Sequence, residues 1–203
     1  MIRFSETVLP GHPDKFCDLV ADAIVQEATR LDRDAYAQVE VGVWSDQMWI
    51  SGGVAARVPF ERSLEDIVSS VGQSIGLDKS NWIDASRYRI HSALCLENRD
   101  PTAWSHHVND QCVVSGWAGY DEKVAYFPPE HFLANALRDA LYAACRKGPL
   151  AGHGPDGKLL VRMREESGLF QVEHLLVTLQ QQAGTEFIPF VGQVEAVLRG
   201  AYA

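Results

Sequence analysis

The apolar residues that follow residue 12 recur at helical spacing. Between Pro13 and about Leu31 they fall every three or four positions, at Phe16, Leu19, Val20, Ala23, Ile24 and Ala28. This spacing places them on one face of a helix, and Pro13 suits the first turn because a first-turn N–H has no partner within the helix. A second helix is predicted from a cap at Ser63 through Ile75, where the inward positions are Leu64, Ile67, Val68 and Val71.

Between these two helices the pattern changes to that of a β-hairpin. Residues Ala37–Trp44 and Met48–Ala55 alternate or run apolar around the polar sequence Ser45-Asp46-Gln47, and the second run leads into Gly52-Gly53. A further strand is predicted near Arg87–Leu94.

The second half of the chain repeats this order of elements. The expected elements are a strand at Gln111–Ala118, a helix at Pro129–Arg146, strands near Lys158–Glu165 and Phe170–Leu179, and a helix at Ile188–Leu198. Two copies of helix–hairpin–helix predict an α+β fold of two repeated two-layer units, each with helices packed on one face of a mostly antiparallel sheet. The polar stretch Glu97–Asn109 is the best internal boundary, which gives regions 1–104 and 105–203.

Composition supports a folded protein and excludes several classes. The chain has 203 residues, of which 46% are hydrophobic and 22% charged, as in ordinary globular domains. A net charge of −9 argues against a nucleic-acid partner, because such binding needs a basic face. Met1–Pro10 lacks the apolar segment of a signal peptide, and no apolar run approaches about 18 residues, so we expect a cytoplasmic protein with no membrane partner.

The four cysteines show no metal-site spacing. Cys17, Cys95, Cys112 and Cys145 are scattered without a Cys-x-x-Cys pair, so we interpret them as reduced thiols. The adjacent His106 and His107 are interpreted as loop residues, since no acidic or thiol partner stands at ligand spacing.

The most specific stretch of the chain runs from Ser5 to Lys15 and stands immediately before the first predicted helix. His12 offers a hydrogen-bond donor, Asp14 an oxygen ligand for Mg²⁺, and Lys15 a positive charge. Free N–H groups at a helix start also favour anions, so a polyphosphate site is predicted. The alternative is a Gly-His-Pro turn in which Asp14 only stabilises the helix.

This stretch resembles the amino-terminal signature of the S-adenosylmethionine synthetases, which form S-adenosylmethionine from ATP and L-methionine. The resemblance rests on Gly-His-Pro-Asp-Lys after Ser-Glu-Thr-Val. Further similarities follow in the family's order: Val39-Glu40-Val41, Gly52-Gly53, Asn109-Asp110-Gln111, Gly116-Trp117-Ala118 and Gly154-Pro155-Asp156-Gly157-Lys158. They span nearly the whole chain, and the family's fold agrees with the predicted α+β units.

The resemblance implies a role for each matched residue. His12, Lys15 and Lys158 would be the catalytic residues that contact the phosphates of ATP. Asp14 would hold Mg²⁺, and Glu40 would belong to the site of a monovalent cation, K⁺. The remaining assignment is Asp110, which would bind the ammonium of methionine or a ribose hydroxyl.

The chain departs from the family pattern around the amino-acid pocket. Val54 stands where the family has the glutamate of Gly-Gly-Glu, and Cys112 replaces a glycine of the Gly-Asp-Gln-Gly loop. Glu97 falls roughly where a glutamine contacts methionine, so it is expected to bind substrate with a changed side chain.

The family's Gly-Gly-Gly-x-Phe-Ser-Gly-Lys-Asp run is absent from these 203 residues. Because family members build their sites between subunits, we expect a subunit of a split or heteromeric synthetase, a hetero-oligomer whose second protein chain supplies the missing carboxy-terminal segment. The reaction would release phosphate and diphosphate. Two alternatives remain: a non-catalytic structural or regulatory subunit, and a related adenosyltransferase with an altered amino-acid substrate.

Overall fold

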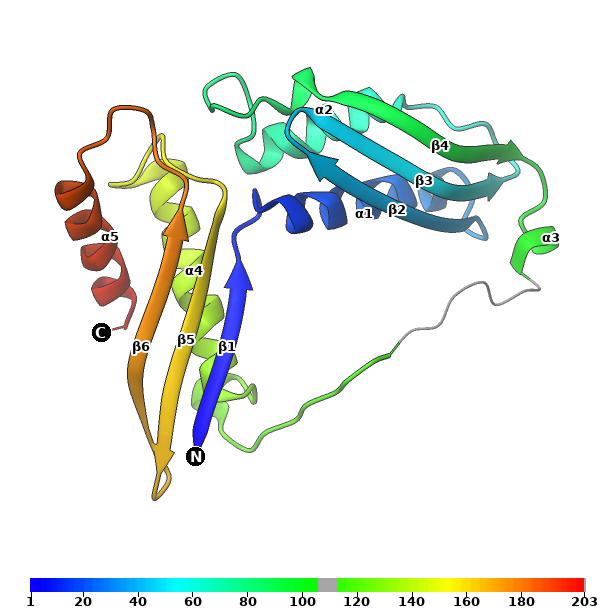
Figure 1. Cartoon of the computed structure of the whole chain (residues 1–203). Helices are drawn as coiled ribbons and strands as arrows, with labels where there is room; N and C mark the ends of the chain where they lie inside the picture. The colour runs from blue at the N-terminus through cyan, green and yellow to red at the C-terminus, as the bar shows by residue number, and fades with distance from the viewer. Residues whose placement is uncertain (106–112, 203) are drawn as a thin grey trace. The chain divides into compact units, whose positions relative to one another are not determined.

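The computed structural model describes residues 1–105 and 113–202, and they form two compact units (Figure 1). Unit 1 comprises Met1–His12 and Val114–Ala203, and unit 2 comprises Pro13–Val113. Each unit has a three-stranded sheet with helices on one face, so the predicted α+β class and the two-layer units are confirmed.

Unit 2 is built from α1 (Pro13–Leu31), β2 (Tyr36–Trp44), β3 (Gln47–Ala56), α2 (Leu64–Ile75) and β4 (Arg89–Asn98). The strand order is β2-β3-β4, with the first pair antiparallel and the second parallel. Helices α1 and α2 cover one face of this sheet. The buried core contains Phe16, Val20, Ile24, Ala28, Met48, Ile50, Val54, Ile67, Val68, Ile75, Leu77 and Ala85. The predicted helices and hairpin of this unit are confirmed.

The ends of α2 follow from two local residues. The Ser63 side chain accepts a hydrogen bond from the Asp66 N–H and satisfies a donor that the helix leaves unpaired. Gly76 then takes a left-handed conformation, φ 97°, that ends the helix. The predicted cap at Ser63 is therefore confirmed.

Unit 1 is built from β1 (Ile2–Val8), α4 (Pro129–Lys147), β5 (Gly157–Glu166), β6 (Leu169–Leu179) and α5 (Phe187–Tyr202). Its strand order is β1-β5-β6, and both pairs are antiparallel. Residues of α4, β5 and α5, with one residue of the segment between α4 and β5, form the core, which contains Ala134, Leu137, Leu141, Ala144, Cys145, Leu150, Leu159, Val161, Met163, Phe190, Val194 and Leu198. The predicted second set of helix, hairpin and helix is also confirmed.

Strand β1 was not predicted, because its inward face is polar. Arg3 pairs with Glu130 at 3.5 Å, Ser5 hydrogen-bonds His131 at 3.2 Å, and Arg138 donates to Thr7 at 3.2 Å. The helix partners of these contacts all lie on α4. The apolar residues Ile2 and Phe4 lie on the exposed face of β1, so the apolar pattern does not mark the face that meets the helix.

The prediction of a strand at Gln111–Ala118 is wrong for residues 113–118, which have no regular structure. Residues 111 and 112 lie outside the described part of the chain. Val113 is 93% exposed and Val114 is 86% exposed, so these β-branched residues have no buried face that would hold a strand.

The compact units are divided differently from the predicted regions 1–104 and 105–203. Because β1 pairs with β5 along its full length, the first twelve residues belong to unit 1. The boundary at residue 104 stays a prediction about family regions. Among the described residues, no helix combines the length and apolar character needed to cross a bilayer.

Candidate functional site

Two segments that carry the family-like motifs lie side by side in unit 1. The Leu9 N–H donates to the Gly157 carbonyl at 2.8 Å, and the Gly11 N–H donates to the Pro155 carbonyl at 3.2 Å. The backbone then turns, since the His12 N–H donates to the Leu9 carbonyl at 3.0 Å. The structure therefore brings the end of β1 against the segment that leads into β5.

Gly11 is required by the closeness of this contact. A Cβ at residue 11 would lie 2.5 Å from Pro155 Cγ and 2.8 Å from the Pro155 carbonyl carbon, so a larger residue would push the segments apart. The peptide bond between Gly154 and Pro155 is cis.

Asp156 lies in the same place and was given no role in the sequence. Burial raises the pKa of the Asp156 carboxyl, and the nearby His12 acts in the opposite direction on that pKa. The hydrogen bond from Gly11 to Pro155 brings His12 and Asp156 near one another although 144 positions separate them in the sequence. Only the backbone pairing of the two segments reveals that these two residues are neighbours.

Lys158 is the first positively charged residue of β5. Its Nζ lies 2.8 Å from Oε1 of Glu6 on β1, and both side chains are partly exposed, 37% for Lys158 and 47% for Glu6. Of the four residues predicted to meet the phosphates or their Mg²⁺, His12 and Lys158 belong to unit 1.

The other two predicted phosphate-site residues, Asp14 and Lys15, stand in the first turn of α1 in unit 2. Lys15 Nζ lies 3.5 Å from Asp18 Oδ2. Asp14 offers one carboxylate beside the N–H groups of a helix start. Mg²⁺ is commonly held by one or two carboxylates together with substrate phosphates and water, so the chemistry of Asp14 fits a nucleotide-borne Mg²⁺.

Several predicted residues lie outside the described part of the chain. They are Asp110, Cys112, His106 and His107, together with the flanking Asn109 and Gln111. The predicted role of Asp110 stays a prediction.

Glu40 lies on the exposed side of β2, opposite Ser51 of β3. Within residues 1–105 and 113–202, the structure has no group of three or more His, Cys, Asp or Glu side chains that could hold a metal ion. A cation held by one carboxylate with carbonyl or water ligands needs no such group, so K⁺ binding at Glu40 stays a prediction.

Val54 and Glu97, the two departures from the family's amino-acid pocket within the described residues, line one small cavity of unit 2. Its volume is about 190 Å³, and its other walls include Val58, Phe60 and Leu96. Val54 itself is 2% exposed and belongs to the core. Glu97 forms an ion pair with Arg99 and accepts a hydrogen bond from the Cys95 thiol at 3.3 Å. The cavity therefore offers apolar walls and one carboxylate that is already paired.

Each glycine of the Gly52-Gly53 pair in β3 is required for a different structural reason. Gly52 has φ +121°, and a Cβ there would collide with the Gln38 carbonyl oxygen. Gly53 lies under the Trp104 ring, whose Cζ3 would be 2.5 Å from a Cβ at residue 53. Trp104 belongs to the short helix α3 (Thr102–Ser105) and also meets the Tyr36 ring edge-on.

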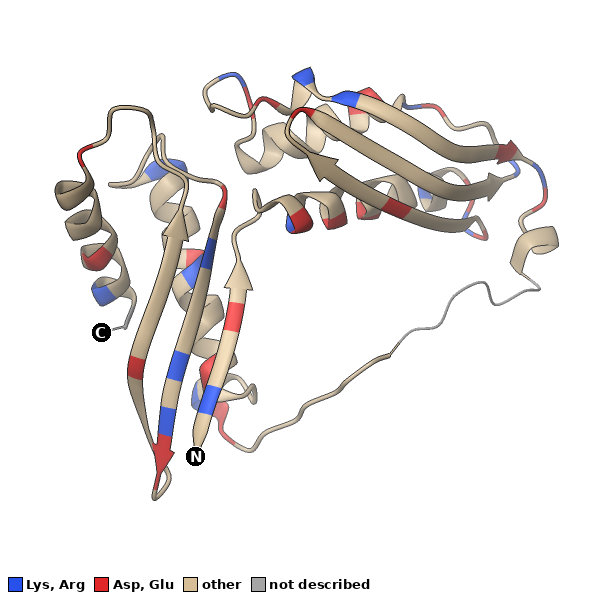
Figure 2. Ribbon diagram, in the orientation of Figure 1, with Lys and Arg blue, Asp and Glu red and all other residues tan. Residues whose placement is uncertain are grey.

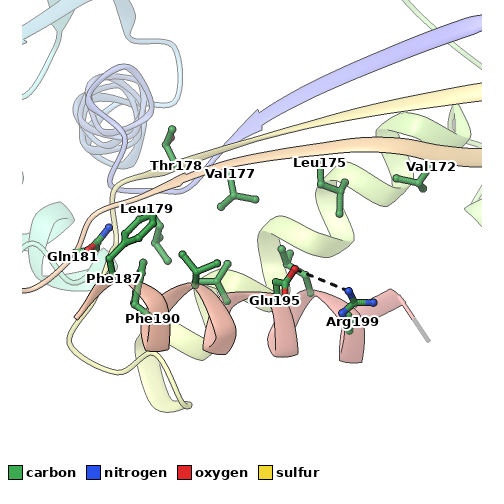
Figure 3. Close-up of a pocket in the computed structure, with 13 residues that line it drawn as sticks. Val172, Leu175, Val177, Thr178, Leu179, Gln181, Phe187, Phe190, Glu195 and Arg199 are labelled. Atoms are coloured by element: carbon green, nitrogen blue, oxygen red, sulfur yellow. Dashed lines mark ion pairs between the residues drawn. The ribbon is translucent and has the colours of Figure 1, made fainter. Parts of the chain in front are cut away.

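A larger groove lies between β6 and α5 in unit 1 (Figure 3). Its volume is about 720 Å³, and apolar side chains such as Leu175, Val177 and Phe187 line it. Glu195 and Arg199 form an ion pair at 4.0 Å on its wall. Among the described residues, none of the predicted site residues lines this groove.

The buried thiols do not have the chemistry of nucleophiles. Burial, with a smaller effect of Asp14 and Asp18, raises the pKa of Cys17 to about 11. Burial alone raises the pKa of Cys145 to about 11. Both thiols therefore stay protonated near neutral pH. Cys17, Cys95 and Cys145 are free thiols in the structure, as the sequence predicted.

Comparison with known proteins connects this geometry to one family. The family model described as S-adenosylmethionine synthetase, N-terminal domain, matches residues 1–97. S-adenosylmethionine synthase 1 of Rhodospirillum rubrum is 28% identical over 202 residues, which cover 96% of this chain and 52% of the relative. The chain is similar to the S-adenosylmethionine synthetases over nearly its whole length. The S-adenosylmethionine synthase of a Synechococcus strain is 30% identical over 199 residues, 89% of this chain and 47% of the relative.

A solved structure shows the same fold. A structure described as an unusual S-adenosylmethionine synthetase from Campylobacter jejuni superimposes with a TM-score of 0.83 at 22% identity. The match covers 100% of this chain and 54% of that one. The chain thus spans about half the length of the relatives it matches.

Proposed function

We propose that this chain is a subunit of a methionine adenosyltransferase and that it supplies phosphate-binding residues to a site completed by a second protein chain. The observation that carries the proposal is the hydrogen-bonded pairing of the segments that carry His12 and Lys158, two residues of family-like motifs far apart in the sequence. The substrates would be ATP and L-methionine, and the products S-adenosylmethionine, phosphate and diphosphate.

The reaction needs the kind of residues that this chain provides. A thioether sulfur carries no proton, so its attack on C5′ of ATP requires no general base. Catalysis depends on in-line positioning and on stabilising the departing triphosphate. In this proposal His12, Lys15 and Lys158 donate to phosphate oxygens, and Asp14 binds Mg²⁺, which would neutralise phosphate charge. Glu40 would contribute to a K⁺ site.

The charge of the described residues supports a contribution from a second chain. Lys15 faces Asp18, and Lys158 faces Glu6, so each proposed phosphate-binding lysine already has a carboxylate neighbour. A triphosphate is a highly charged anion and needs more positive charge than two paired lysines supply. Further cationic residues from a partner, together with Mg²⁺, would provide it. The complex would then be a hetero-oligomer.

The decisive experiment mixes the purified chain with a candidate partner that carries the family's glycine–lysine loop. With ATP, L-methionine, Mg²⁺ and K⁺ present, we expect S-adenosylmethionine, detected by mass spectrometry, together with phosphate and diphosphate. If no pairing yields product, the proposed activity is wrong.

Substitutions in the active complex test the residue roles. His12→Ala and Lys158→Gln should each lower kcat about 10- to 150-fold, because one charge-assisted contact contributes about 1.5–3 kcal/mol. Lys123→Gln removes the same charge from an exposed position of unit 1 outside the family-like motifs and serves as the control. Unchanged turnover of the complex with both Lys15→Gln and Lys158→Gln would instead indicate a non-catalytic structural or regulatory subunit.

One observation favours an altered amino-acid substrate as the second candidate. Val54 and Glu97 line the same small cavity, and the Glu97 carboxylate is paired with Arg99. If Glu97 binds substrate, the cavity suits an apolar thioether chain better than a free ammonium. Competition of labelled methionine by uncharged thioethers would support this candidate, and failure of such compounds to compete would exclude it.

A further inference from the structure

The outer face of the sheet in unit 1 carries an ion pair that joins β1 to β5. Glu6 stands opposite Leu160, and Lys158 stands opposite Val8, so the two charged residues are diagonal neighbours on one face. Their 2.8 Å contact links a residue of the amino-terminal stretch to the lysine of the second motif.

A second set of ion pairs on the same face, around Glu173, can be compared with the Glu6–Lys158 pair. Glu173 of β6 lies 3.1 Å from Arg162 and 2.5 Å from Arg164, and it is only 16% exposed. Figure 2 shows basic residues along β5, with acidic positions on both neighbouring strands. Glu173 is therefore held by two arginines and shielded from water. Among residues 1–105 and 113–202, Glu6 has one cationic partner, and it is 47% exposed. This is the type of ion pair that exchanges partners at little cost.

We infer that Glu6 is a positioning residue that competes with substrate phosphates for the Lys158 ammonium. This inference rests on the proposed function. When the phosphate site is empty, Glu6 holds the ammonium on the outer face of β5. When a phosphate binds, its oxygen replaces the carboxylate as the hydrogen-bond acceptor of Lys158.

Two physical effects give Glu6 this role. An ammonium has three N–H donors, so Lys158 can begin to donate to phosphate before its bond to Glu6 breaks. A phosphate that contacts Lys158 also approaches the Glu6 carboxylate, and the two negative charges repel one another. Glu6 therefore lowers the affinity for the phosphate chain and favours its release after reaction.

The test measures binding of inorganic tripolyphosphate to the full chain by NMR shifts of the lysine side chains at low ionic strength. Glu6→Gln should bind tripolyphosphate about two- to fivefold more tightly than the unchanged chain. Glu173→Gln should bind with unchanged affinity. Both variants raise the net charge by the same amount, so long-range attraction of the anion is matched, and amide spectra of both confirm the fold.

A second pair of variants shows whether Glu6 acts through Lys158. Lys158→Gln should weaken binding, and Glu6→Gln should have no further effect in that background. If Glu6→Gln binds no more tightly than Glu173→Gln, or if its effect persists without Lys158, the role of Glu6 is overturned while that of Lys158 stands. If Lys158→Gln leaves binding unchanged, or if millimolar tripolyphosphate does not saturably shift the Lys158 signals, both Glu6 and the proposed phosphate site are refuted.

Discussion

At the scale of single residues, the Asp156 carboxyl links the motif before β5 to the stability of unit 1. Burial raises its pKa in the folded protein above the value of about 3.9 for an unfolded chain. Between these two values the folded state keeps the proton and the unfolded state has lost it. The free energy of unfolding therefore falls as pH rises through this window.

Asp156→Asn should abolish this fall in the free energy of unfolding with rising pH. We expect the variant to gain stability relative to the unchanged chain as the pH rises above about 4, because an amide carries no charge to bury. Urea unfolding of unit 1 at pH 4 and pH 7 measures the effect. A stability difference that is the same at both pH values would contradict it.

The backbone at Gly52 supports a second residue-scale prediction. Gly52→Ala should lower the free energy of unfolding by about 1–3 kcal/mol, since φ +121° is unfavourable for alanine and the Gln38 carbonyl occupies the space. Gly42→Ala on β2 is the matched control, because no atom of the described residues other than Gly42 and its chain neighbours lies within 4 Å of the position that its Cβ would take. Urea unfolding should show little or no loss for Gly42→Ala; equal losses for the two variants would contradict the explanation.

At the scale of elements, the residues at helix ends and the residues that face the core decide where helices and strands form. The α2 helix has a side-chain cap at Ser63, a left-handed Gly76 after its last turn and apolar residues on the face that meets the core. Strand β1 has instead three polar contacts to α4, so its position depends on hydrogen bonds and ion pairs across the two elements.

The α2 cap can be tested with two substitutions at one site. Ser63→Ala should destabilise unit 2 by about 0.5–2 kcal/mol, because the Asp66 N–H loses its acceptor. Ser63→Asp keeps an acceptor at the cap and should retain most of the stability. Urea unfolding and amide hydrogen exchange in the first turn of α2 measure both effects. Slower exchange in Ser63→Ala than in Ser63→Asp would be the contrary result.

At the scale of the whole molecule, the two units have separate cores. Every buried residue of the unit 2 core lies between Phe16 and Ala85, whereas unit 1 combines β1 with residues after 113. The pairing of β1 with β5 explains why the first twelve residues belong with the distant second half.

A fragment of residues 13–113 should therefore fold by itself. We expect cooperative unfolding and amide shifts close to those of the same residues in the full chain, because the fragment keeps its entire core. A fragment of residues 1–104 should show the same core signals but random-coil shifts for residues 2–8, which have lost β5. Strand-like shifts at residues 2–8 in that fragment would contradict the assignment of β1 to unit 1.

Local patterns were enough to predict most of the elements. Helix α1 begins at Pro13 and ends at Leu31, as its apolar spacing predicted, and the hairpin turn falls at Ser45-Asp46. The strand predicted at 111–118 is wrong over 113–118, since strand propensity without a buried face does not hold a strand. The candidate residues follow from the resemblance of short motifs, and their roles stay predictions.

By itself, the sequence indicated the resemblance to the family, the α+β class and the helix–hairpin–helix order, because apolar periodicity, caps and short motifs are local properties of the chain. Only the tertiary structure decided that residues 9–11 pair with residues 155–157, that Glu6 meets Lys158, and that Val54 and Glu97 share a cavity. These contacts join positions far apart in the chain, and the register between strands, which no local pattern encodes, sets them.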